Sequence, residues 1–469
     1  MKGTVCFNGV NGVTGQYLAP QESAGEITGR LAAEPNARLS DRAQRTDTRV
    51  LGLPFDVSPL EAERAGWAVV IRRGDQATLS ALQPLLKHRA TTLGERVKVL
   101  QYEGESREVW LAKHRVADSD IDPERVPYYL LVAGQSADIP FSFVHDLAVD
   151  YAVGRVEFDA LDDYTQYAHR IVEYETSATL RQCARRVAFF GPRHEFDGAT
   201  QLSADYLLSP LADPADERSA VKRSGFTPTS DIGSGGTKRR LAELLREADG
   251  KRPALLFTAS HGVGFPMGHE LQKTCQGALL CQEWPSVGEI NEAHYFAGSD
   301  VPADAHVAGL VVFHFACYSA GTPERDRFYK QAGLPPARLT MQPFVAALPK
   351  ELLRRGALAV VGHVDRAWGY SFVSPDSQRE HLQSFENFLG RVLSGEPVGH
   401  AMRDFAQKYA TLSVSLTKWI EKSDFELVSE DLLVQLWTQR NDAGSYLVIG
   451  DPLARIQPEA VAAERHSDE

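Results

Sequence analysis

The sequence contains few cysteines and no long apolar segment. Its five cysteines, an odd number in 469 residues, do not make a disulfide framework. No stretch approaches the roughly 18 consecutive apolar residues that a membrane-spanning helix requires. The first twenty residues also lack the apolar segment of a secretory signal peptide. These absences predict a cytoplasmic protein without a membrane partner, in a reducing compartment where a free thiol persists.

Positive charge is scarce as well. Lysine and arginine number 50 against 62 aspartates and glutamates, a net charge of −12. Because a general nucleic-acid-binding protein carries a basic surface, no nucleic-acid partner is expected. Cys275 and Cys281 form a closely spaced pair, but a zinc site would require a second such pair, which the sequence lacks. We therefore expect neither a metal nor another cofactor.

The apolar residues, 43% of the chain, are concentrated in short β-branched segments that alternate with helical patterns. The predicted strands cover 67–71, 97–101, 128–132, 186–190, 254–258, 309–313, 357–361 and 446–449. The predicted helices cover 76–88, 162–175, 238–248, 344–355, 381–393 and 400–410. Strands that alternate with helices form a largely parallel sheet covered by helices. The predicted fold class is therefore α/β.

The chain is expected to consist of five parts, one of which, 209–240, differs in composition from the rest. An irregular N-terminal extension (1–65) precedes an N-terminal α/β sub-domain (66–208). Residues 209–240 are rich in Pro, Gly, Ser, Asp and basic residues, which predicts a mobile linker. A second α/β sub-domain (241–456) and a short C-terminal tail (457–469) complete the chain.

Three glycines of the extension, in the sequence GVNGVTG (9–15), come after a strand-like segment in the manner of a dinucleotide-binding turn. Such a turn should open a helix and precede a second strand that ends in an acidic residue. Pro20 and Pro35 interrupt the segment after the glycines, and no such strand is evident. A flexible glycine turn is the better interpretation.

Two predicted strands lead into residues that can carry chemistry. Strand 254–258 runs into His261 and Gly262, and strand 309–313 runs into Cys317. In a parallel sheet both segments leave at the carboxyl edge, where α/β proteins bind their ligands. This places a thiol and an imidazole across one crevice, a pairing suited to nucleophilic catalysis. The alternative is that the cysteine is a small buried apolar residue and the histidine is incidental.

The backbone around these two residues suits the same chemistry. Gly262 leaves room for a substrate carbonyl, because it has no side chain. Its N–H group, together with that of Cys317, could form an oxyanion hole. A catalytic dyad of Cys317 and His261 with this pair of donors is therefore the leading hypothesis for the site.

Several segments resemble the caspase, gingipain and CHAT-domain superfamily (clan CD) of cysteine peptidases. They are TASHGVGF (258–265), QGALLCQEW (276–284), VVFHFACYSAGTP (311–323) and GALAVVGHVDRAW (356–368). The spacing agrees, since the histidine lies 56 residues before the cysteine here and about 50 before it in caspases. Four further segments of this chain are similar to the gingipain branch in particular: YYLLVAGQSADIPF (128–141), VHDLAVDYAVGR (144–155), YTQYAHRIVEYE (164–175) and SYLVIGDPLARI (445–456). The likeness covers roughly residues 66–456.

The resemblance implies a fold, an activity and a specificity. It implies a caspase-like catalytic sub-domain beside a second gingipain-like one, and a cysteine endopeptidase that cleaves proteins after Arg, and less readily Lys. Asp146 matches the aspartate at the base of the gingipain specificity pocket, Trp368 matches an indole of its wall, and His363 is placed to border it. A carboxylate and an indole face would bind a basic side chain. The alternatives are that Asp146 is a turn residue, with Asp150 as the nearest rival, and that Trp368 belongs to the core.

Control and biological role remain hypotheses from the sequence. The 209–240 segment offers basic residues as cleavage sites, namely Arg218, Lys222, Arg223, Lys238, Arg239 and Arg240. Cleavage there, by the chain itself or by an upstream peptidase, would activate a zymogen; the alternative is incidental nicking. Bacterial relatives act in antiviral defence, some beside CRISPR effectors, and the resemblance implies a role of that kind. A catalytically silent caspase-like scaffold is the non-enzymatic alternative, although such a protein is expected to lack the cysteine or the histidine.

Overall fold

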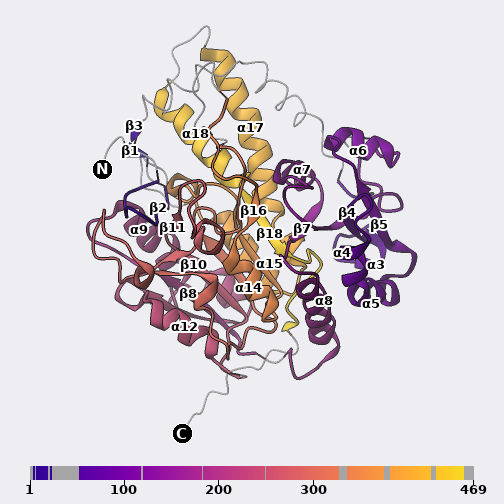
Figure 1. The fold of residues 1–469 in the computed structure, drawn as a ribbon, viewed down its shortest axis with the longest axis horizontal. Helices are drawn as coiled ribbons and strands as arrows, with labels where there is room; N and C mark the ends of the chain where they lie inside the picture. The colour runs from indigo at the N-terminus through magenta and orange to yellow at the C-terminus, as the bar shows by residue number, and fades with distance from the viewer. Residues whose placement is uncertain are drawn as a thin grey trace.

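A ten-stranded sheet flanked by helices forms the centre of the computed structural model (Figure 1). The structure describes residues 4–5, 7–18, 22–23, 52–117, 120–181, 183–248, 250–326, 335–373, 381–423 and 429–458. In spatial order the strands are β5 (Val97–Tyr102), β4 (Trp67–Arg72), β6 (Tyr129–Ala133), β7 (Ala152–Val156), β18 (Tyr446–Gly450), β17 (Ala359–His363), β14 (Val311–Phe315), β10 (Leu255–Ala259), β8 (Arg186–Gly191) and β9 (Thr227–Ile232). All eight strands predicted from apolar periodicity are confirmed.

The sheet consists of two parallel halves that run in opposite directions. Among the described strands of this sheet, only the β17–β18 pair is antiparallel. The carboxyl ends of β17, β14, β10 and β8 therefore share one edge. The α/β class with a mostly parallel, helix-flanked sheet, the class of the caspase-like fold, is as predicted.

Helices surround this sheet, and a small second sheet lies at its edge. The helices are α3 (Ala62–Ala65), α4 (Gln76–Ala81), α5 (Gln83–Leu93), α6 (Arg107–Lys113), α7 (Phe141–Leu147), α8 (Leu161–Thr176), α9 (Gly198–Ser203), α10 (Ser209–Leu211), α11 (Ala220–Arg223), α12 (Lys238–Arg246), α13 (Gln272–Cys275), α14 (Ala347–Arg354), α15 (Gln383–Leu393), α16 (Val398–Ala401), α17 (Arg403–Ser423) and α18 (Glu430–Ala443). The small sheet has the order β13 (Tyr295–Phe296), β12 (Leu279–Leu280), β11 (Gly262–Gly264) and β2 (Gly9–Asn11). Two strand pairs, β1 (Thr4–Val5) with β3 (Glu22–Ser23) and β15 (Gly321–Thr322) with β16 (Phe344–Val345), stand apart. None of the described helices is long and apolar enough to cross a bilayer.

Residues 209–240 differ from the predicted mobile linker. They contain α10, α11 and β9, and β9 pairs with β8 along its whole length, from Thr227 to Ile232. The sequence of β9, TPTSDI, is polar and contains Pro228, so it does not show the apolar pattern of a buried strand. An edge strand needs hydrogen bonds on one side only and therefore tolerates proline and polar residues.

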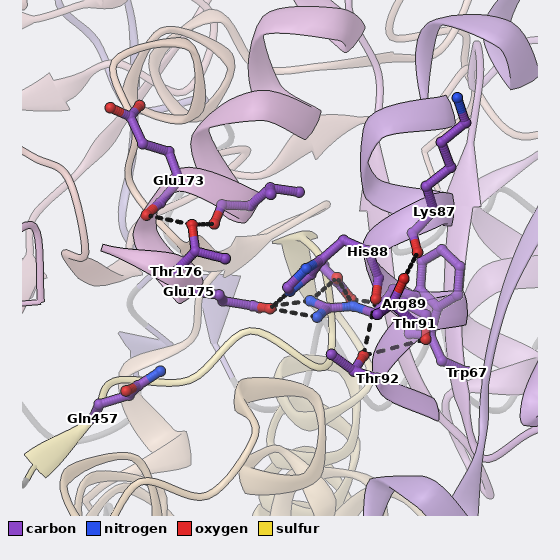
Figure 2. Close-up of polar contacts among 12 residues, drawn as sticks. Trp67, Lys87, His88, Arg89, Thr91, Thr92, Glu173, Glu175, Thr176 and Gln457 are labelled. Atoms are coloured by element: carbon purple, nitrogen blue, oxygen red, sulfur yellow. Dashed lines mark hydrogen bonds and ion pairs between the residues drawn. The ribbon is translucent and has the colours of Figure 1, made fainter. Parts of the chain in front are cut away.

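The turn after β18 joins the last strand to helices from the first half of the sheet. Asp451 accepts hydrogen bonds from the Trp67 indole (2.9 Å) and from Arg89 (2.8 Å), and is fully buried. Figure 2 shows Arg89 of α5 pointing toward Glu175 of α8, which it contacts at 2.6 Å, while His88 contacts the same carboxylate at 2.7 Å. Burial acts to raise the pKa of Glu175, but Arg89 and His88 outweigh it and lower that pKa to about 2. The sheet is thus tied together by a satisfied, largely buried charge network.

Candidate active site

Strand pairing brings the predicted histidine and cysteine segments together. β10 pairs with β14 in parallel, with Ala259 opposite Phe315, and the Ser260 N–H continues the ladder to the Phe315 carbonyl at 3.0 Å. His261 and Cys317 come directly after these strand ends, and both are fully buried. The two residues therefore lie on adjacent loops at one edge of the sheet.

Gly262 allows these two loops to approach each other closely. A Cβ atom at this position would lie 1.8 Å from the Cys317 carbonyl oxygen and 2.8 Å from the Cys317 nitrogen. Only glycine fits such a backbone approach. Tyr318, next to Cys317, has a φ of 58°, a left-handed conformation that non-glycine residues rarely adopt and that is frequent at functional sites.

His261 is held in one orientation by a carboxylate and two rings. Its Nε2 lies 2.9 Å from Asp197 Oδ2. Because an ionised carboxylate only accepts hydrogen bonds, Nε2 carries the proton and Nδ1 is free to act as a base. Nδ1 is buried and has no hydrogen-bond partner among the described residues. The rings of Tyr17 and Trp284 lie 5.8 and 5.7 Å from the imidazole and limit its rotation.

Asp197 is a third member of the site and was not predicted from the sequence. It lies after β8, the strand beside β10, and caps α9 by accepting the Thr200 N–H at 2.9 Å. The Tyr17 hydroxyl donates to its other oxygen at 2.7 Å. Burial acts to raise the pKa of Asp197, but His261, Tyr17 and Thr200 outweigh it and hold that pKa below its usual range. An aspartate six residues after the end of β8, in the N-cap position before Gly-Ala-Thr, was the available signal.

Two backbone N–H groups converge on a single carbonyl oxygen beside the thiol. The Gly262 N–H donates to the Asn8 carbonyl oxygen at 2.8 Å, and the Cys317 N–H donates to the same oxygen at 3.1 Å. These are the two donors that the sequence suggested for an oxyanion hole. The carbonyl belongs to the N-terminal extension, where the sequence predicted irregular chain and a flexible glycine turn, and where the structure has β2 parallel to β11. Figure 1 shows β2 beside β11 and α9.

The Cys317 thiol is buried in this arrangement. Its Sγ accepts a hydrogen bond from the Ala367 N–H at 3.3 Å. Burial raises the pKa of Cys317 to about 12, although the Ala367 N–H and Arg366 act to lower it. In this conformation the sulfur is therefore a protonated thiol.

Trp368 and His363 lie on the strand and loop that border the thiol. The Trp368 ring packs 5.7 Å from Phe7, and the backbone N–H of Trp368 donates to Asp442 Oδ1 at 2.8 Å. The same carboxylate lies 3.0 Å from His363 Nε2. Asp442, from α18, therefore positions both residues around the segment that contacts the thiol.

Asp146 lies near the C-terminal end of α7. It is an exposed residue of α7 and lines a cavity of about 680 Å³ together with His145, His400 and Tyr446. Of the described residues that line this cavity, none is Cys317, His261 or Trp368. Its rival Asp150 lines the same cavity and forms an ion pair with Arg107. The structure thus brings His261, Cys317, the two N–H donors, Trp368 and His363 into one region. The cavity that Asp146 lines reaches Tyr446, whose ring lies 4.0 Å from that of His363.

The chain was compared with known proteins by sequence and by structure, and only the comparison of structures found similar proteins. No family model matches the sequence, and no curated protein matches it. A solved structure described as "Structure of Protease" aligns with a TM-score of 0.48 and 11% identity, over 84% of this chain and 79% of that one. The Saccharomyces cerevisiae separase–securin complex at 3.0 Å resolution aligns with a TM-score of 0.33 and 11% identity, over 69% of this chain and 15% of that one. Because these TM-scores and identities are low, the chemistry of this chain has to be inferred from its own side chains.

Proposed function

We propose that this chain is a cysteine endopeptidase with Cys317 as nucleophile and His261 as its proton-transfer partner. One observation supports it above the others: the N–H groups of Gly262 and Cys317 point at one carbonyl oxygen of an extended peptide beside the thiol. Preorganised donors of this kind stabilise the oxyanion of acyl transfer. A metal is not needed for this chemistry, because the imidazole and the two N–H groups supply the proton transfer and the charge stabilisation.

Each group has a defined task in the proposed reaction. Cys317 Sγ attacks the substrate carbonyl carbon while the thiol proton passes to His261 Nδ1, and the two N–H groups bind the oxyanion. His261 then protonates the leaving amine, and water hydrolyses the thioester. Asp197 is a positioning residue that fixes the Nε2–H tautomer and stabilises the imidazolium.

A thiol-directed peptidyl electrophile tests this function. The wild type should be labelled at Cys317, and Cys317→Ala should lose the label. His261→Ala should label slowly, because nothing then takes the thiol proton. Cys281→Ala is the matched control, since Cys281 is also a fully buried cysteine but lies directly after β12 and not at the end of β10 or β14. Labelling at Cys281 rather than Cys317, or equal labelling without His261, would favour the catalytically silent scaffold.

Substrate preference for a basic residue before the cleaved bond belongs to the same proposal. It rests on the gingipain-like segments around Asp146, while Trp368 stands beside the thiol and can offer its indole to a long side chain. A positional peptide-library digest tests it. If the wild type prefers Arg or Lys and Asp146→Asn loses this preference, Asp146 reaches the specificity pocket. If the variant keeps the preference, another group provides the negative charge that binds the basic side chain. An acidic or large apolar preference would refute the basic specificity.

Activation by cleavage in residues 209–240 also remains a proposal. Arg218 is the basic residue best placed for it, because its side chain is 95% exposed and it lies in a turn between α10 and α11. A role in a bacterial defence or signalling cascade is implied only by the resemblance. Replacing all six basic residues of this segment and measuring peptide hydrolysis tests activation: an unchanged response would show that the segment is not the switch.

A further inference from the structure

The N-terminal segment 7–11 crosses the candidate active site as an extended peptide. On one side of the thiol, Phe7 bridges antiparallel to Trp368, and the Asn8 N–H donates to the Ala367 carbonyl at 3.0 Å. On the other side, β2 pairs with β11, and the Gly12 N–H donates to the Gly264 carbonyl at 2.7 Å. A peptide that adds to a strand edge in this way is held through its backbone.

The bond between Asn8 and Gly9 occupies the position of a scissile bond. Its carbonyl oxygen accepts hydrogen bonds from both oxyanion-hole donors. Gly9, on the amine side of this bond, lies against the sulfur, because a Cβ atom on Gly9 would be only 3.1 Å from Cys317 Sγ and 2.8 Å from Leu18 Cδ1. Glycine is therefore the residue that lets this peptide bond lie next to the sulfur.

We propose that residues 7–11 are a substrate built into the chain, and that Cys317 cleaves the Asn8–Gly9 bond within its own molecule. Until that cleavage, the segment closes the site and keeps the thiol buried and protonated. This inference rests on the proposed peptidase function and adds a defined modification site and a mode of control to it.

The step balances within the groups present and one water molecule. Cys317 Sγ bonds to the Asn8 carbonyl carbon, and its proton moves to His261. The carbon–nitrogen bond to Gly9 breaks, and the Gly9 nitrogen leaves as an amine with the proton from His261. Water then hydrolyses the thioester, so that Asn8 ends in a carboxylate and the thiol is restored.

Asn8 precedes the internal bond, whereas the proposed preference for separate substrates is Arg or Lys, and the two are compatible. The Asn8 amide donates to Ser203 Oγ at 3.5 Å, and its Oδ1 is buried with no hydrogen-bond partner in the described part of the chain. The side chain is therefore poorly matched to its surroundings, and the backbone contacts supply the binding. Because the segment is tethered, its effective concentration at the thiol is high and an optimal side chain is not required.

Cleavage would divide the segment between Asn8 and Gly9. Residues before the cut would keep their contacts at Ala367 and Trp368 and the pairing of β1 with β3. The hairpin after the cut stays attached through β11 and through the hydrogen bond between Tyr17 and Asp197. Once the residues before the cut separate from β3, the edge at Ala367 and Trp368 becomes available to the residues of a substrate that precede its cleaved bond.

Mapping the N-termini of the full-length protein tests the cleavage. Wild type, Cys317→Ala and His261→Ala are purified and incubated in parallel, and new termini are identified by mass spectrometry. A terminus at Gly9 should form in the wild type and be absent from both variants. Asn11–Gly12 is a matched internal control, because it is the same dipeptide in the same hairpin but lies away from the sulfur.

The outcomes separate this inference from the proposed function. If Cys317 is labelled by the electrophile but no Gly9 terminus forms, the peptidase proposal stands and the internal cleavage is refuted. A Gly9 terminus in Cys317→Ala, or equal cutting at Gly12, would show chemical or foreign cleavage and also refute it. Absence of both labelling and cleavage refutes the peptidase and this inference together.

A second variant tests closure of the site without requiring catalysis. Gly9→Val places a side chain against the sulfur, so the segment should leave the site and the thiol should become reactive. We expect alkylation of Cys317 by iodoacetamide at pH 7 to become at least about tenfold faster, since a thiol released from burial returns toward its usual pKa near 8.5. Alkylation of Cys281, also buried, is the control and should not change. An unchanged rate at Cys317 would show that the segment does not cover it.

Discussion

Asp197→Asn is the substitution that best separates catalysis from folding at this site. Asparagine has the same shape and caps helices as well as aspartate does, so α9 should remain intact. The substitution removes the negative charge that faces His261 Nε2 at 2.9 Å. It also offers an amide donor to the imidazole, which would place the histidine proton on Nδ1 and abolish its action as a base.

The expected effect is calculated from the hydrogen bond that is lost. A hydrogen bond to a charged group contributes about 1.5–3 kcal/mol. At 1.36 kcal/mol for each factor of ten, this corresponds to a fall in kcat of about 10- to 150-fold, and a change of tautomer would deepen it. KM should change little, because Asp197 contacts the histidine and not the substrate. An effect on kcat alone is the signature of an interaction needed in the transition state.

Steady-state hydrolysis of the best peptide from the library digest measures this effect, with the melting temperature recorded alongside. Asp205→Asn is the matched control, because Asp205 pairs at the surface with Arg193, where an ion pair contributes about 0–1 kcal/mol. It should leave kcat unchanged. If Asp197→Asn retains most of the wild-type kcat, or loses activity only through KM, the assignment of Asp197 as the positioning residue is wrong.

Three further predictions concern the oxyanion hole, acid stability and proteolysis. Gly262→Ala should reduce kcat by about 10²–10³-fold, because a Cβ would lie 1.8 Å from the Cys317 carbonyl oxygen and must displace an N–H donor; Gly235→Ala, whose Cβ would meet only Asp231 at 3.6 Å, should retain the activity. Glu175 has a folded pKa of about 2 against 4.5 for the free residue, so its contribution of about 3 kcal/mol is present above pH 4.5 and is lost as pH falls toward 2. About half of this energy is lost between pH 5 and pH 3, so Glu175→Gln should flatten the fall in stability over that range by this amount, measured as melting temperature against pH; an unchanged slope would contradict the pairing with Arg89. Limited trypsin digestion should cut after Arg218 before Arg240, because Arg218 is 95% exposed in a turn whereas Arg240 lies in α12 and pairs with Asp231 at 2.9 Å; first cleavage at Arg240 in the resulting mass spectra would refute this order.

Local sequence patterns were sufficient to predict the strands, the α/β class and the neighbourhood of His261, Gly262 and Cys317. An apolar β-branched run forms a buried strand, and the next few residues lie at its end. Parallel pairing then places two such ends side by side without any further information. The polar edge strand β9 lacks that pattern, which is why its composition predicted a linker instead.

The distant groups that complete the site could be identified only from the tertiary structure. Asp197 meets His261 across 64 positions of sequence, and Asn8 reaches the oxyanion-hole donors from the N-terminal extension. Asp146, which the gingipain likeness placed in the specificity pocket, lines a cavity whose described lining includes neither Cys317 nor Trp368, and its role stays a prediction. Such contacts are single hydrogen bonds and close backbone approaches between segments with no shared periodicity, so their partners are set by how the sheet, the loops and the N-terminal strand pack together.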